Sequence, residues 1–95
     1  MVVGVATIEL RLHGVSSLKE KRSIVRKIVH RTRNEFEISV AEVEGMDLHQ
    51  SAVIGLALVT NDRRLANSLI DRAFAFVADL HLAEIVRTDF EILNF

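Results

Sequence analysis

The sequence contains no cysteine and no proline. The absence of cysteine excludes disulfide bridges, thiolate zinc sites and cysteine nucleophiles, and it fits a reducing compartment. The absence of proline removes the strongest helix breaker, so element boundaries must be read from glycines, capping residues and changes of hydrophobic period. No apolar run approaches the roughly 18 residues that a membrane span needs, and residues 1–12 lack the features of a signal peptide. We therefore expect a cytoplasmic protein with no membrane partner.

The net charge of −1 conceals an uneven distribution along the 95 residues. Residues 17–34 hold seven of the twelve basic residues and a single acid, Glu20, which gives this segment a charge of +6. The rest of the chain carries five basic and twelve acidic residues, a balance of −7. A hydrophobic fraction of 49% is typical of a globular chain, and this length suits one modest core. The sequence thus predicts a single, electrically polarised domain over residues 1–95.

Hydrophobic periodicity indicates four strands and two helices. Alternation predicts strands at 3–12, 38–43 and 85–93, and an apolar run predicts an interior strand at 52–59. One helix follows the capping box formed by Ser17 and Glu20 and ends near Asn34, and the other follows residues 60–62 and ends near Asp79. The order strand, helix, strand, strand, helix, strand is that of the split βαβ unit. We therefore predict an α+β, ferredoxin-like fold in which a four-stranded antiparallel sheet carries both helices on one face.

The first helix has two distinct faces. Apolar positions recur at helical spacing toward the core: Leu18, Val25, Ile28, Val29 and Thr32. A neighbouring stripe is basic: Lys19, Arg22, Arg26, His30 and Arg33. Cations spaced along a helix can follow phosphates, whereas the simplest alternative is a solvated surface. The residues predicted to bind RNA or another anion are Lys19, Arg22, Arg26, Lys27 and Arg33.

Lys21 differs from the other cations because helical spacing places it next to the apolar stripe. A partly buried lysine needs a partner. Glu42 is a candidate because it is in phase with the inward residues of its strand. A charged residue at an inward position also predicts a bulge or an exposed strand end. A structural ion pair between Lys21 and Glu42 is a simpler interpretation than a catalytic lysine.

Several short motifs together resemble the YlxP-like family of small bacterial proteins of unknown function. They are SLKEKR at 17–22, Phe36, SVAEV at 39–43, VIG at 53–55 and ND at 61–62. The resemblance covers nearly the whole chain, and it implies a ferredoxin-like fold and a connection with the ribosome but no established activity. His49 stands where the family pattern leads us to expect an aromatic residue after Asp47 and Leu48.

Two further surfaces are candidate contacts for a partner. The expected open sheet face has no aromatic side chain, so we do not expect RNA bases to stack on it. Its small apolar residues, among them Ala41, Val43 and Ala57, could instead pack against a second copy or another protein. The loop of Met46, Asp47, Leu48 and His49 is a second possible partner contact.

Catalytic and metal-binding motifs are weak in this sequence. The turn from Gly14 to Ser17 could hold a phosphate at the start of the first helix, although an ordinary turn and helix cap is the favoured interpretation. The four histidines lack paired ligand spacing, and no serine, histidine and acid form a recognisable triad. We expect no metal and no cofactor. The sequence favours a non-enzymatic protein whose first helix docks on RNA, for which ribosomal RNA or a ribosomal subunit is the candidate, or on an acidic surface. It leaves open a homodimeric interaction or ligand-sensing module and a small phosphate-ester hydrolase.

Overall fold

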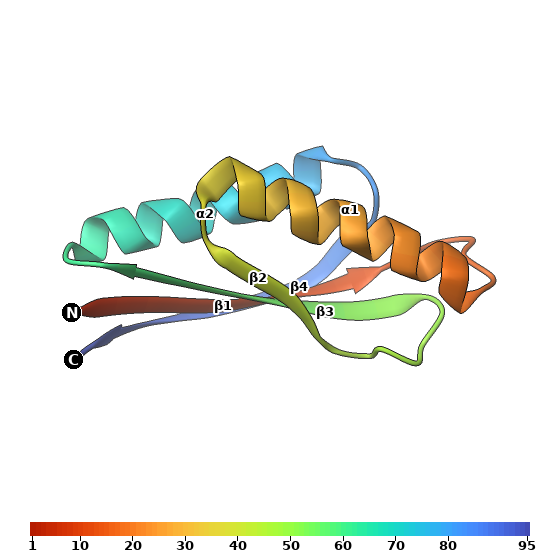
Figure 1. Cartoon of the computed structure of the whole chain (residues 1–95), viewed down its shortest axis with the longest axis horizontal. Helices are drawn as coiled ribbons and strands as arrows, with labels where there is room; N and C mark the ends of the chain where they lie inside the picture. Colours follow the sequence, from red (N-terminus) through yellow and green to blue (C-terminus); the bar gives the residue numbers. More distant parts are fainter.

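The computed structural model describes all 95 residues, and its elements follow the predicted order. The strands are β1 (Val2–Arg11), β2 (Ser39–Glu44), β3 (Ser51–Thr60) and β4 (Glu84–Asn94), and the helices are α1 (Leu18–Phe36) and α2 (Arg63–Asp79). Both helices lie on one side of the sheet (Figure 1). Neither helix is long and apolar enough to cross a membrane.

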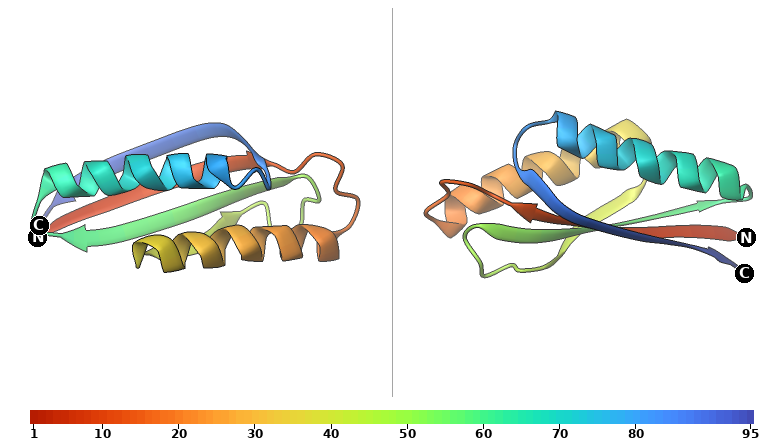
Figure 2. Two further views of the ribbon diagram at one scale, coloured as in Figure 1. Left: turned by 90° about the horizontal axis from the view of Figure 1, so that it is seen from above. Right: turned by 180° about the vertical axis from the view of Figure 1, so that it is seen from behind.

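The four strands form one antiparallel sheet in the order β2-β3-β1-β4. β1 and β3 occupy the centre of the sheet. Each alternates residues that are buried under the helices with residues on the opposite face, which we call the open sheet face. α1 runs along the β2 side of the sheet and α2 along the β4 side, and the two chain ends lie side by side (Figure 2). The predicted ferredoxin-like α+β fold is therefore confirmed.

A single hydrophobic core lies between the helices and the sheet. α2 contributes a stripe of small and branched residues to it: Ala66, Ile70, Ala73 and Val77. Gly4 on β1 lets this helix approach closely, because a Cβ atom at that position would lie 3.1 Å from Ile70 Cδ1. Close approach by α2 thus depends on the absence of a side chain at Gly4.

The inward faces of α2 and β4 differ from what the sequence pattern alone suggests. Leu65 is exposed, and Phe76 packs edge-on against Phe36 of α1 with the ring centroids 5.5 Å apart. Val86 and Phe90 of β4 are 42% and 50% exposed, although the alternation suggested an inward face for this strand. The reason is the position of β4 at the edge of the sheet, where α2 does not cover it completely.

Local backbone features explain where the elements begin, end or bend. The register of β2 against β3 shifts between Glu42 and Glu44, which confirms the bulge expected from the phase of Glu42. α1 ends at Phe36 and is capped by Glu37, which adopts a left-handed conformation with φ 52° and donates its amide to the carbonyl of Arg33. Asp62 caps α2 by accepting from the Arg64 amide at 2.9 Å.

Candidate nucleic-acid interface

α1 is fixed at its start and along its inner face. The Ser17 hydroxyl accepts a hydrogen bond from the Glu20 amide at 3.1 Å, as the capping-box spacing predicted. The inner face then buries Lys21, Val25, Ile28 and Thr32 against the sheet. Since consecutive residues are about 100° apart around a helix, burial of this stripe determines which flank each cation occupies.

Lys21 is fully buried and lies against Glu42, with 3.0 Å between Lys21 Nζ and Glu42 Oε2. The same ammonium donates a hydrogen bond to the carbonyl oxygen of Gly45. The two residues that the sequence suggested as an ion pair are therefore in contact. Their pairing ties α1 to the end of β2 and balances the charge of the Glu42 carboxylate.

A groove of about 490 Å³ runs between α1 and β2. Its walls are formed by three arginines, a histidine, a glutamate and two valines: Arg22, Arg26, Arg33, His30, Glu42, Val25 and Val29. Because Lys21 balances Glu42, the three arginines dominate the charge of the groove. We refer to this feature as the arginine groove.

The arginines of the groove have no carboxylate partners. The ion pairs in the structure are His13–Glu84, Lys21–Glu42 and Arg87–Asp89, and none of them involves Arg22, Arg26 or Arg33. Arg33 Nη2 donates to the carbonyl of Val40 at 2.6 Å, which fixes the guanidinium without cancelling its charge. The positive charge of this flank is thus available to an external anion.

The structure separates the five predicted RNA contacts into two groups. Arg22, Arg26 and Arg33 line the groove, whereas Lys19 and Lys27 are exposed elsewhere on α1. Lys27 follows Arg26 by about 100° of rotation, which turns it toward the other flank of the helix. His30 lines the groove but was not among the predicted contacts, although its spacing of four residues from Arg26 already placed it on the basic stripe.

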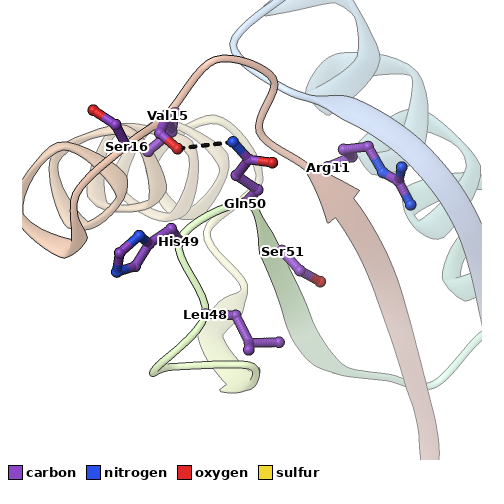
Figure 3. Close-up of a pocket in the computed structure, with 7 residues that line it drawn as sticks. All are labelled: Arg11, Val15, Ser16, Leu48, His49, Gln50 and Ser51. Carbon is purple, nitrogen blue, oxygen red and sulfur yellow. Dashed lines mark hydrogen bonds between the residues drawn. The ribbon is translucent and has the colours of Figure 1, made fainter.

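The loop between β2 and β3 is exposed at Met46, Asp47, Leu48 and His49. Part of it borders a second hollow of about 540 Å³ beside the β1–α1 turn, where Gln50 Nε2 donates to the carbonyl of Val15 at 3.0 Å (Figure 3). In this view Arg11 and His49 lie at opposite ends of the hollow and do not point toward one another. A role for the loop in partner contact stays a prediction.

The Gly14–Ser17 turn gains no additional anion ligand in the structure. Gly14 adopts a positive φ of 74°, and the Ser17 hydroxyl already serves as the α1 cap. No group of three or more histidine, aspartate or glutamate side chains is arranged to hold a metal ion. A hydrolase based on this turn stays a prediction without further structural support.

The open sheet face carries exposed apolar side chains on β1, β2 and β3. Val43 and Val59 are exposed there, and Val3, Val5 and Val53 are partly exposed. Val43 lies directly over Gly55, where a Cβ atom would come within 2.9 Å of Val43 Cγ1. The homodimer through this face, suggested by Ala41, Val43 and Ala57, also stays a prediction.

The fold and the arginine groove define a class: a small split-βαβ domain with an unneutralised cationic flank on its first helix. A family model described as "Protein of unknown function (DUF503)" matches residues 3–90, and the chain therefore belongs to this family. It is 32% identical over 76 residues to the "Uncharacterized protein YlxP" of Bacillus subtilis (strain 168), covering 80% of this chain and 83% of that protein. The predicted family resemblance is thus confirmed.

Solved structures with the same fold have unrelated sequences. One titled "Structural Genomics, protein YJCS" has a TM-score of 0.60 at 13% identity, covering 97% of this chain and 99% of that chain. Another, "De novo designed protein Foldit4", has a TM-score of 0.54 at 11% identity, covering 99% and 97%. These similarities show the fold alone.

Proposed function

We propose that this protein binds RNA through the arginine groove beside α1, with ribosomal RNA or a ribosomal subunit as the partner, and performs no catalysis itself. The observation that carries the proposal is the absence of carboxylate partners for Arg22, Arg26 and Arg33. Only Lys21 and Arg87 of the twelve lysines and arginines form ion pairs, so what distinguishes this flank is that three unpaired arginines line one groove. Their concentration on one flank supports a role in binding anions.

The spacing of the arginines suits a chain of phosphates. A helix rises about 1.5 Å per residue, so Arg22 and Arg26 are about 6 Å apart along the axis and Arg33 lies about 10 Å farther on. Guanidinium groups bind phosphate oxygens through two parallel hydrogen bonds. The groove therefore offers three phosphate contacts in a row, and the exposed Lys19 can add a fourth.

The form of recognition follows from what the groove lacks. It contains no phenylalanine, tyrosine or tryptophan on which an unpaired base could stack, its only ring is that of His30, and the open sheet face has no aromatic side chain among its outward residues. Binding would then act on the RNA backbone and on its shape rather than on base identity. The proposal places the protein in the cytoplasm, where ribosomal RNA is found.

The proposal is tested by co-sedimentation with purified ribosomal subunits over a series of salt concentrations. Four phosphate contacts predict that the logarithm of the binding constant falls with a slope of about −3 against the logarithm of salt concentration on single-stranded RNA. The double variant Arg22→Glu and Arg26→Glu should lose salt-sensitive binding, because it removes two contacts and introduces two repulsive charges.

A matched control on the same helix separates the groove from net charge. Lys27→Glu with Arg31→Glu changes the chain charge by the same amount, but neither residue lines the groove. We expect this control to retain most of the binding. Equal loss in both double variants, or unchanged sedimentation of the Arg22 and Arg26 variant, would refute the arginine groove as the RNA contact.

A further inference from the structure

The two edges of the sheet differ in how they are protected. β2 is six residues long, and Arg33 reaches it from α1, donates to the Val40 carbonyl and also borders a hollow on the open sheet face. β4 is eleven residues long and forms the opposite edge with no strand beyond it. Arg63 donates to the Ile92 carbonyl at 3.3 Å, but no side chain bonds to the backbone of residues 86–90. The register of β4 against β1 shifts at Val86, which has no partner on β1, so the regular, open part of this edge begins at Arg87.

Residues 86–90 also expose apolar side chains beside that edge. Val86 is 42% and Phe90 is 50% exposed, and both flank Thr88, which is exposed as well. Thr88 pairs with the buried Ile8 of β1, so its side chain lies on the helix-bearing side of the sheet. Phe90 pairs with Ala6 and lies on the same side. An apolar patch thus borders the free backbone of β4 where α2 does not reach.

The order of side chains in this segment is symmetric about Thr88. Read in either direction, the sequence Val86-Arg87-Thr88-Asp89-Phe90 runs from an apolar residue to a charged residue, threonine, a charged residue and an apolar residue. The two charged residues are of opposite sign. If two copies pair antiparallel with Thr88 opposite Thr88, each Arg87 faces Asp89 of the other copy, and each Phe90 lies next to the bulged Val86 of the other copy.

We propose that β4 pairs with β4 of a second copy of this chain in this antiparallel register, forming a dimer with a continuous eight-stranded sheet. Arg87 and Asp89 already contact each other within one chain at 3.1 Å, and both side chains are exposed. In the dimer they become a cluster of four alternating charges on the open sheet face. Opposite charges on directly facing strand residues stabilise pairing, as do facing apolar residues.

Neighbouring registers are disfavoured by the same charges. Shifting the symmetry axis to Asp89 brings two aspartates face to face, and shifting it to Arg87 brings two arginines together. An axis at Phe90 sets Asp89 opposite Glu91 twice. Like charges that face each other across a strand pair are destabilising, so only the Thr88 register pairs every charge in the segment with its opposite.

The test uses single charge reversals and their mixture. Arg87→Glu alone sets a glutamate against Asp89 of the other copy, and Asp89→Arg alone sets Arg87 against a second arginine. We expect either change to raise the dimer dissociation constant about tenfold or more in light-scattering measurements. In an equimolar mixture of the two variants, each homodimer still sets like charges against each other. The mixed dimer instead sets opposite charges against each other in both cross-strand pairs.

In the mixed dimer, the two chains carry opposite charges at positions 87 and 89. The Arg87→Glu chain carries two acids at positions 87 and 89, and the Asp89→Arg chain carries two arginines at the same positions. Every acid of one chain therefore faces an arginine of the other, so native mass spectrometry should detect the mixed dimer in preference to either homodimer.

Recovery of dimer formation in the mixture reports only the contact between chains. Each variant still lacks the Arg87–Asp89 pair within its own chain, so that pair cannot explain the recovery. Circular dichroism of each variant should show an unchanged fold, since both side chains are exposed. A wild-type chain that stays monomeric at millimolar concentration would overturn the proposal, as would failure of the mixture to form mixed dimers. A dimer that survives Arg87→Glu and is broken by Ala57→Lys would place the contact on the open sheet face and also overturn it.

Discussion

Replacing Lys21 with methionine removes the only charged side chain that is fully buried in the chain. Methionine fills a similar volume, so the change deletes a charge without leaving a large cavity. Glu42 then loses the one cation in contact with its carboxylate, and its side chain is only 17% exposed. The Gly45 carbonyl loses its donor as well.

The expected loss of stability is large for a single substitution. Breaking a buried pair by removing one partner costs about 3 to 5 kcal/mol, and the partial exposure of Glu42 favours the lower end. A loss of about 3 kcal/mol corresponds to a fall in melting temperature of about 12 to 24 °C for a domain of this size. Urea unfolding measures the free energy directly, with an unchanged slope if both states keep their compactness.

A double-mutant cycle provides the control. Lys21→Met combined with Glu42→Leu removes both charges, so it should be clearly more stable than Lys21→Met alone. If Lys21→Met costs less than about 1 kcal/mol, or if the double variant is as unstable as the two single changes added together, then the two charges do not act as a coupled buried pair.

Three further predictions concern capping, backbone strain and packing. Ser17→Ala removes the acceptor for the Glu20 amide and should lower the unfolding free energy by about 1 kcal/mol in urea, whereas Ser16→Ala, at the exposed neighbouring residue, should leave it unchanged. Glu37→Gly relieves a left-handed conformation at φ 52° and should raise the unfolding free energy by about 1 kcal/mol; a lower melting temperature would contradict this. Gly55→Ala places a Cβ atom 2.9 Å from Val43 Cγ1 and should cost about 1 kcal/mol, which the additional change Val43→Ala should restore if overpacking is the cause.

Local patterns were sufficient to predict the fold. Alternation in β1 and the Ser17–Glu20 capping spacing depend only on residues near in sequence, and both are present as expected. The phase of Glu42 likewise indicated the bulge of β2 and pointed to Lys21 as its partner. These signals are reliable because a misplaced charge or apolar residue is costly in any arrangement of the helices and strands.

Features that depend on the lateral order of the elements could not be predicted. The alternation of β4 suggested a covered inner face, but its edge position leaves Phe90 exposed. The composition of the arginine groove depends on which flank of α1 faces β2, so counting charges included Lys27 and left out His30. Both differences come from packing between elements that are far apart in the sequence.

The unequal protection of the two sheet edges limits how far association of this chain can proceed. A protein with two open edges can add copies at both sides and grow into a fibre, whereas one with a single open edge is saturated after one partner. β2 offers little free backbone, because it is six residues long, its register shifts between Glu42 and Glu44, and Arg33 occupies its Val40 carbonyl. Pairing through β4 would therefore end at a closed, twofold particle, with an arginine groove at each of its far ends.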